Sequence, residues 1–166
     1  MSTDIIEVIA RGVWRQRGRV LVCRNRKHGH AFLPGGHVEH GEDARAALVR
    51  EMWEEVGLRM RAGRFLGVCE SVFRDPRAKG RVTHEVNLVF ELRPAAGERV
   101  RPAEVRSRED KIDFDWMVVA SLRRARRSAV TRPPLLPAAI AQLIPTASRT
   151  HGTAGRAYLL DARTRK

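Results

Sequence analysis

Glu51, Glu54 and Glu55 are the residues of this chain whose types and spacing most directly suggest chemistry. At 100° per residue in a helix, all three lie within about a third of the circumference. Like charges at this spacing cost about a few tenths of a kcal/mol per pair when nothing neutralises them. Carboxylate oxygens are also the ligands that hard divalent cations prefer. The cluster therefore indicates either a solvated acidic face or a platform for divalent cations.

A helix over residues 43–56 would carry this acidic face. Its composition favours helix, Glu42 and Asp43 lie at the positive end of its dipole, and Gly57 is placed as a C-terminal stop. An apolar ridge recurs at helical spacing beside the acids, and we expect it to pack into a core. The ridge consists of Leu48, Met52 and Val56.

A glycine-rich turn at Pro34-Gly35-Gly36 precedes the helix and lets backbone approach a ligand closely. From Gly36 to Leu58 the spacing is G-x5-E-x7-R-E-M-x-E-E-x-G-L. This resembles the signature of the Nudix hydrolases, G-x5-E-x7-R-E-U-x-E-E-x-G-U, where U is aliphatic. Met52 departs mildly from the usual Leu, Ile or Val. At roughly 6% usage per letter, seven fixed matches arise by chance about once in several hundred million starting positions.

The resemblance implies hydrolysis of a diphosphate linkage in a nucleoside diphosphate joined to another group, with Mg²⁺ or Mn²⁺ as cofactor. It assigns catalysis to Glu51, Glu54 and Arg50, and metal binding to Glu51, Glu54, Glu55 and the backbone carbonyl of Gly36. Glu51 is either a metal ligand or the general base, and Arg50 orients a glutamate. Glu42 mainly anchors the loop. Gly35 and Glu39 are substrate-side candidates, and Glu39 is also a candidate ligand.

An acid outside the signature is a further candidate, because Nudix members differ in which residue serves as the base. Glu109 and Asp110 precede a predicted strand that contains Trp116, and Glu85 is held in reserve. An ordinary exposed turn accounts equally well for Glu109 and Asp110. Glu85 could instead be a solvated strand residue.

The remaining elements indicate an α/β fold. Strands are predicted at 5–13 and 19–23, joined by a hairpin turn at 16–18, and at 31–33, 64–73, 81–92 and 112–118. Helices are predicted at 43–56, at 119–127, and from Pro133-Pro134 over about ten residues, ending near Pro145. The Nudix resemblance implies a mixed β-sheet sandwiched between α-helices, with the signature as a loop–helix–loop at one edge.

Histidines, cysteines and aromatic residues add weaker signals. The histidines at 28, 30, 37 and 40 are interpreted as polar loop residues that could contact phosphate rather than as a metal site, and His84 as a satisfied core histidine. Cys23 and Cys69 are predicted to be buried free thiols. The aromatic side chains at 14, 32 and 73 could stack a base, but core positions are favoured. Pro76 lies close to a position that the family associates with ADP-ribose enzymes.

Positive charge is concentrated near the C-terminus. Residues 1–119 hold 22 Lys/Arg and 18 Asp/Glu, whereas residues 120–166 hold 10 and 1, for a net charge of +13. We expect a Nudix domain over 1–145 and a basic, flexible tail over 146–166. The tail could attract nucleic acid or a membrane surface. An arginine-rich composition shared by the whole chain is favoured, because Tyr158 is the one aromatic residue there.

A length of 166 residues indicates one domain. The sequence has no apolar run of about 18 residues, so a cytoplasmic protein without a membrane segment is expected. Its partner is expected to be a small nucleotide, and monomer and homodimer both remain open. The alternatives to a small-nucleotide pyrophosphohydrolase are a catalytically silent nucleotide-binding module and an RNA 5′-end pyrophosphohydrolase. The intact carboxylates favour the first function.

Overall fold

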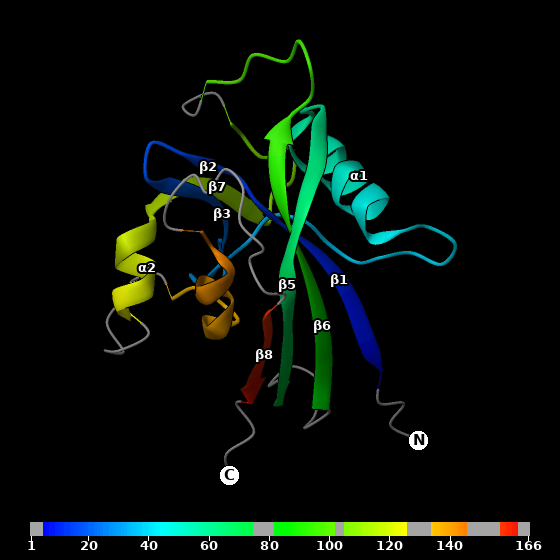
Figure 1. The fold of residues 1–166 in the computed structure, drawn as a ribbon, viewed down its shortest axis with the longest axis vertical. Helices are drawn as coiled ribbons and strands as arrows, with labels where there is room; N and C mark the ends of the chain where they lie inside the picture. The colour runs from blue at the N-terminus through cyan, green and yellow to red at the C-terminus, as the bar shows by residue number, and fades with distance from the viewer. Residues whose placement is uncertain (1–4, 75–81, 102–104, 126–133, 146–156, 163–166) are drawn as a thin grey trace.

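The computed structural model describes residues 5–74, 82–101, 105–125, 134–145 and 157–162. One sheet is mixed and contains, in spatial order, β1 (Ile6–Val13), β6 (Val82–Pro94), β5 (Met60–Arg74) and β8 (Ala157–Ala162) (Figure 1). β1 runs parallel to β6, β6 antiparallel to β5, and β5 parallel to β8. β5 begins at Met60 rather than at the predicted residue 64, because its first residues pair with the end of β6 across a bulge.

The second sheet is antiparallel and has β3 (Arg19–Asn25) at its centre. β7 (Ile112–Val118) pairs with the whole of β3, while β2 (Arg15–Gln16) and β4 (Ala31–Phe32) pair with its two ends. The predicted hairpin turn forms, with positive φ at both central residues as a tight two-residue turn requires. It joins β3 to β2 instead of to β1, because β1 pairs with β6 along its length and belongs to the other sheet.

α1 (Ala44–Val56) carries the signature acids and is capped at both ends. The Asp43 side chain accepts hydrogen bonds from two amides of the first turn. Gly57 adopts the left-handed conformation that ends helices, with φ of 74°. The predicted apolar ridge is confirmed, since Leu48 and Met52 are fully buried and Val56 packs against the same core.

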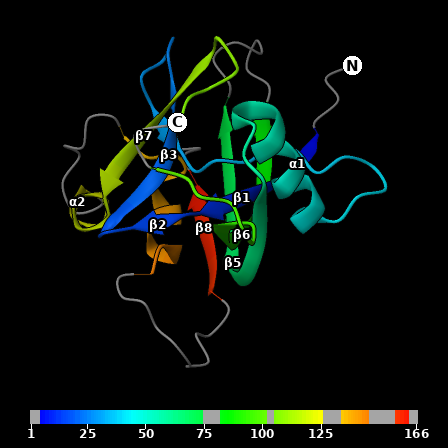
Figure 2. The same ribbon diagram turned by 90° about the horizontal axis from the view of Figure 1, so that it is seen from above.

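Helices lie on both sides of the sheets, which confirms the predicted α/β fold (Figure 2). α1 packs against β1 and β5 on one side. On the other side lie α2 (Val119–Ala125), which contacts β7, and the 3₁₀ helix η2 (Ala138–Leu143), which contacts β5 and β8. Residues 126 and 127 of the predicted second helix fall outside the described ranges. In the described ranges, no helix is long and apolar enough to cross a membrane.

The helix predicted from Pro133 to near Pro145 is wrong in extent and type. Ala31 N–H donates to the Pro134 carbonyl at 2.8 Å, and Leu136 N–H donates to the Ala31 carbonyl at 2.7 Å, so this segment runs extended beside β4. Pro137 holds the residue before it extended, and winding therefore begins only after it. What forms is the short 3₁₀ helix η2, and Pro133 lies outside the described ranges.

The expectation of a flexible tail is also wrong for residues 157–162. They form β8, which pairs in parallel with Gly67–Val72 of β5. The segment lacks the apolar–polar alternation that marks a half-buried strand, and its partner lies far away in the sequence. Residues 146–156 and 163–166 lie outside the described ranges, so the domain boundary at 145 stays a prediction.

Candidate active site

The loop before α1 lies along the outer edge of β1. The backbone bonds are Val38 N–H to Val8 O at 2.9 Å, Ala10 N–H to Gly36 O at 2.9 Å and Gly12 N–H to Pro34 O at 2.8 Å. Gly35 has φ of +118°, and a Cβ there would lie 2.1 Å from the carbonyl oxygen of Ala10. The close backbone approach expected at the glycines is therefore made to β1. These backbone contacts with β1 fix the position of the loop relative to α1.

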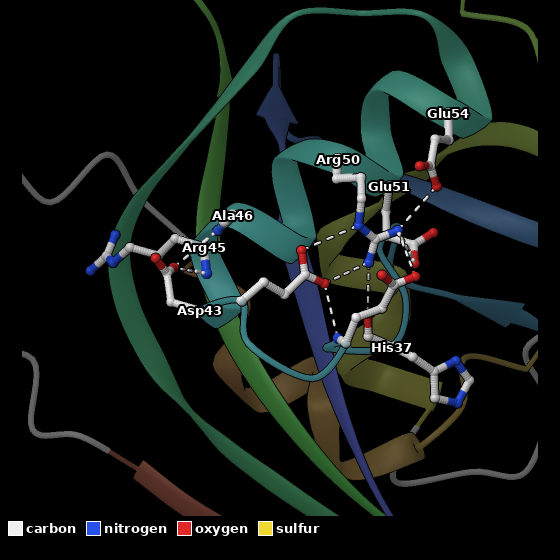
Figure 3. A network of polar contacts seen from close by, with 9 residues as sticks. His37, Asp43, Arg45, Ala46, Arg50, Glu51 and Glu54 are labelled. Carbon is white, nitrogen blue, oxygen red and sulfur yellow. Dashed lines mark hydrogen bonds and ion pairs between the residues drawn. The ribbon is translucent and has the colours of Figure 1, made fainter.

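Arg50 is the centre of a hydrogen-bond network that joins this loop to the helix (Figure 3). Its Nε and Nη2 donate to the two carboxylate oxygens of Glu42 at 3.2 and 2.7 Å, and Nη2 also donates to the His37 carbonyl at 3.1 Å. Its Nη1 donates to Glu51 at 3.2 Å and to Glu54 at 3.0 Å. The bond with Glu42 raises the pKa of Arg50 and lowers that of Glu42. Arg50 thus holds both Glu51 and Glu54 in fixed orientations.

The three helix glutamates occupy different environments although they share one face. The Glu54 side chain is 54% exposed, that of Glu51 is 18% exposed, and Glu55 is buried at 7%. Burial raises the pKa of Glu51. Burial, and after it the charges of Glu51 and Glu109, raises the pKa of Glu55 to about 8. Glu55 Oε2 is buried without a hydrogen-bond partner among the described residues. Such an oxygen beside other carboxylates favours a cation ligand over a solvated face.

The two predicted acids on the loop before β7 separate in the structure. Glu109 lies close enough to Glu55 for its charge to raise the pKa of that carboxyl, and the preceding Arg108 N–H donates to the Glu55 carbonyl at 2.7 Å. Asp110 lies beside Arg26, whose Nη1 donates to the Asp110 carbonyl at 3.1 Å. Glu109 therefore lies near the buried carboxyl of Glu55, whereas Asp110 belongs to the surface beside β3 and β7.

Arg11, which was not singled out from the sequence, lies beside the signature loop and contacts Asn87. Arg11 lies on β1, and its Nε donates to Asn87 Oδ1 at 3.2 Å. Its Nη1 donates to the carbonyl oxygens of Leu33 at 3.1 Å and Gly35 at 2.7 Å. Asn87 lies fully buried on β6, and its amide donates to the predicted reserve acid Glu85 at 3.4 Å. An arginine in the middle of the apolar run 5–13 was the available signal.

A family model described as a NUDIX domain matches residues 5–138, a range that includes the loop, α1 and every strand from β1 to β7. The chain belongs to the Nudix family. The resemblance seen in the signature is thereby confirmed.

Similar proteins agree with this Nudix assignment. The chain is 37% identical over 90 residues to an ADP-ribose pyrophosphatase of Methanocaldococcus jannaschii, covering 52% of this chain and 50% of that protein. It is 34% identical over 89 residues to a MutT-like protein of Streptomyces ambofaciens, covering 54% and 52%. The matched stretches thus span about half the length of these relatives. A MutT protein structure from Methanosarcina mazei superposes with a TM-score of 0.60 at 20% identity, covering 87% of this chain and 94% of that one, which shows the Nudix fold.

The Nudix signature implies a divalent cation, and the donors of this site fit one. Glu51, Glu54 and Glu55 offer carboxylate oxygens, and Glu55 Oε2 lacks a hydrogen-bond donor within the described part of the chain. The Gly36 carbonyl accepts one bond from Ala10 N–H, which leaves a second lone pair. Among the described residues, no three His, Cys, Asp or Glu side chains already form a metal cluster. Arg50 bonds to one oxygen each of Glu51 and Glu54, which leaves the second oxygen of each carboxylate for a cation.

The described histidines differ in their surroundings, and His37 lies in the signature loop, where its carbonyl accepts from Arg50 Nη2 at 3.1 Å. His28 and His30 stack on each other with ring centroids 6.2 Å apart. His84 is half-buried and has Glu70 as its partner at 2.5 Å, as expected of a satisfied histidine. Cys23 and Cys69 are confirmed as buried free thiols.

The aromatic side chains differ in how far they fit the core prediction. Trp14 is confirmed as a core residue at 4% exposure and packs edge-on against Trp116. Phe32 and Phe73 are half-buried, and Phe32 lies under the Arg11 guanidinium. Pro76 lies outside the described ranges.

Proposed function

We propose that the chain is a metal-dependent pyrophosphohydrolase that cleaves the diphosphate linkage of a nucleoside diphosphate joined to a second group. The observation that carries this proposal is the buried, unpartnered oxygen of Glu55 next to Glu51 and Glu54. Mg²⁺ or Mn²⁺, when bound, supplies positive charge that neutralises phosphate oxygens. In the reaction a water oxygen bonds to one phosphorus atom, and a bridging P–O bond breaks. The leaving phosphate keeps that electron pair, and the proton of the water passes to a carboxylate.

We assign a different role to each acid according to its environment. Glu54 and Glu55 would hold the cation, with the Gly36 carbonyl as a further donor. Glu51 is either a third ligand or the base, and a carboxyl whose pKa is raised by burial accepts a proton more readily. If Glu51 is a ligand, Glu109 or Glu85 takes the proton instead.

Two residues on the loop side of the site are proposed to face the substrate. The Glu39 side chain is 70% exposed, and its backbone N–H donates to Glu42 Oε1 at 2.9 Å. The Gly35 carbonyl accepts its bond from Arg11 and so lies on the same side of the loop as that guanidinium. Glu39 is therefore exposed close to Arg50 of α1, whereas Gly35 is buried and would act through its backbone.

The proposed substrate class is a small nucleotide. The relative whose name is ADP-ribose pyrophosphatase places ADP-ribose first among the candidates. A panel of ADP-ribose, nucleotide sugars, dinucleotides and nucleoside triphosphates, each with Mg²⁺ or Mn²⁺, tests the proposal through phosphate-bearing products. We expect turnover of at least one diphosphate-linked member, and no turnover after chelation of the metal. Glu51→Gln prepared in parallel controls for a contaminating hydrolase.

Folded protein that turns over no member of the panel would contradict the enzyme proposal. Calorimetry on the same panel then decides what remains. Tight binding of an intact nucleotide without product would support the silent regulatory module instead.

Action on RNA 5′ ends is a second candidate, and the net charge of +13 favours it. Under this alternative the domain at 1–145 does the chemistry, and the basic tail at 146–166 attracts RNA. Binding through phosphate neutralisation weakens steeply with salt. We expect the free nucleotide to be the better substrate even at low salt. A faster, salt-sensitive rate on 5′-triphosphate RNA would reverse that order.

Location in the cytoplasm stays a prediction from the sequence.

Gly36→Ala is expected to impair activity without unfolding the protein. A Cβ at this position would lie 2.3 Å from Glu51 Oε1, which is the movable end of a side chain. The clash therefore displaces the carboxylate, and a misplacement of about 1 Å lowers turnover by roughly 10–100-fold. Steady-state kinetics on the best panel substrate and urea denaturation without metal measure the two effects.

Gly35→Ala is the matched variant with the opposite expectation for stability. Its Cβ would meet the Ala10 backbone carbonyl at 2.1 Å, and φ of +118° is strained for alanine. The free energy of unfolding should fall by roughly 1–3 kcal/mol, the cost of such a backbone conformation. Near-parental turnover of Gly36→Ala would show that Glu51 is not the group whose position matters.

A further inference from the structure

Arg11 is a half-buried cation held on β1 between the signature loop and β6. Its Nε donates to Asn87, its Nη1 donates to the carbonyls of Leu33 and Gly35, and its guanidinium carbon lies 5.2 Å from the ring centroid of Phe32. Four contacts from two strands and one loop therefore fix the guanidinium in a single orientation. Fixing a side chain with this much rotational freedom costs conformational entropy, so the guanidinium is already ordered before a ligand arrives.

The Nη2 group of this guanidinium has no hydrogen-bond partner among the described residues, although every other nitrogen of Arg11 does. The bond from Nη1 to the Gly35 carbonyl places the guanidinium beside the signature loop, and the charges of Glu85, Glu55 and Glu51 all act on it. An arginine in place with two N–H donors unused offers a preformed contact for an anion.

The arrangement is electrostatically incomplete without an anion. The carboxylates attract both a divalent cation and Arg11, while the cation and the guanidinium repel each other. An anionic group between the two positive charges removes that repulsion. The substrate proposed above carries such a group in its diphosphate.

We propose that Arg11 is a substrate-binding residue whose Nη2 donates to a non-bridging oxygen of the diphosphate, lying between the guanidinium and the cation held by the signature acids. This inference rests on the proposed function for the identity of the anion. It makes cation and diphosphate binding cooperative. The diphosphate screens the repulsion between the cation and Arg11, and the cation screens the repulsion between the diphosphate and the signature carboxylates.

Arg45 provides a matched control within the same chain. Its guanidinium carbon lies 4.9 Å from the ring centroid of Phe90, and its Nη1 contacts the carbonyl oxygens of Ala62 and Gly63. Arg45 therefore shares with Arg11 the ring contact and the two carbonyl contacts. It is exposed, and no carboxylate contact to its guanidinium is present in the described part of the chain.

Calorimetry with the full chain tests the proposal in two titrations. The first uses Mg²⁺ alone. The second uses α,β-methylene ADP, a diphosphate analogue that cannot be hydrolysed, in the presence of Mg²⁺. Arg11→Gln should weaken analogue binding by roughly 10–100-fold, as expected for losing a charge-assisted bond. The same variant should bind Mg²⁺ alone more tightly than the parent does, because a repelling charge is gone. Arg45→Gln should leave both affinities within about threefold.

A purely structural Arg11 would behave differently, because loosening the loop weakens Mg²⁺ and analogue together. Joint weakening, or analogue affinity within threefold of the parent, would overturn the proposal. If Arg11→Gln shows no cooperative unfolding transition in a metal-free thermal melt, Arg11→Lys tests the proposal instead. It keeps the charge but loses the planar fork, and should weaken the analogue severalfold while leaving Mg²⁺ affinity unchanged.

The calorimetry and the substrate panel fail independently. Analogue binding that depends on Arg11 without turnover of any panel member would leave this inference standing and remove the enzyme proposal. Turnover of a panel member together with analogue affinity that does not depend on Arg11 would support the enzyme proposal and remove this inference.

Discussion

Replacing Glu51 by glutamine is expected to lower turnover by roughly 10²–10⁴-fold, the range for losing acid–base assistance. Glutamine keeps the size of the side chain and an oxygen that can accept from Arg50 Nη1. It loses the negative charge that a cation ligand or a base requires. Glu54→Gln should act similarly if Glu54 is a ligand, since it shares the same Arg50 contact. Steady-state kinetics with Mg²⁺ on the best panel substrate measures both variants.

The metal-free fold should survive these two changes. Each removes a like-charge contact on α1 and weakens one bond to Arg50, so the free energy of unfolding should shift by less than about 1 kcal/mol in either direction. Glu98→Gln is the control, because Glu98 pairs with Arg59 outside the signature. That variant should keep parental turnover. Near-parental turnover of both Glu51→Gln and Glu54→Gln would show that α1 is not the catalytic platform.

The parts of the signature helix that were predicted correctly depend on short-range spacing. A helix of this length is specified by its caps and its apolar ridge, and Asp43, Gly57 and Met52 occupy those roles in the structure. Interactions within about one helical turn determine these features. Spacing likewise places three acids on one face without reference to the rest of the chain.

Spacing could not reveal how differently the rest of the fold treats those acids. Glu54 and Glu55 are neighbours in sequence, yet one is largely exposed and the other is buried near Arg11 and Glu109. That difference arises from strands and a loop distant in sequence. Arg11 was missed for the same reason, because its partner Asn87 lies on β6.

The errors in the fold have the same origin. β8 pairs in parallel with β5, which is distant from it in the sequence. β1 pairs with β6 and not with β3, the strand to which a hairpin was predicted to join it. Parallel pairing requires long connections and has no turn signature. Local patterns therefore identified most strands but not the sheet to which each belongs.

Glu55→Gln is expected to stabilise the metal-free protein at alkaline pH. The carboxyl has an ordinary pKa of 4.5 when unfolded, and burial raises its pKa to about 8 in the folded protein. Between these values the unfolded chain releases a proton that the folded chain keeps. The free energy of unfolding of the parent therefore falls as pH rises from 4.5 to 8, and this contribution is constant outside that window.

At about 1.36 kcal/mol per pKa unit the loss is at most about 5 kcal/mol, and relaxation around a buried charge reduces it. We expect Glu55→Gln to be more stable than the parent by about 1–3 kcal/mol at pH 8.5, and equal within about 1 kcal/mol at pH 5. Urea denaturation at both pH values, in chelator, measures the difference. A difference that does not change with pH would contradict a proton held by burial.

The same variant should lose most of its stabilisation by divalent cations. A ligand that binds only the folded state raises the free energy of unfolding by about 2.7 kcal/mol at one hundred times its dissociation constant. In the parent, a cation at Glu55 must displace the bound proton, so this gain should be larger at pH 8.5 than at pH 5. Glu98→Gln should gain as much from Mg²⁺ as the parent does. If Glu55→Gln gains equally, the unpartnered oxygen of Glu55 is not a cation ligand, because glutamine offers no charge to replace it.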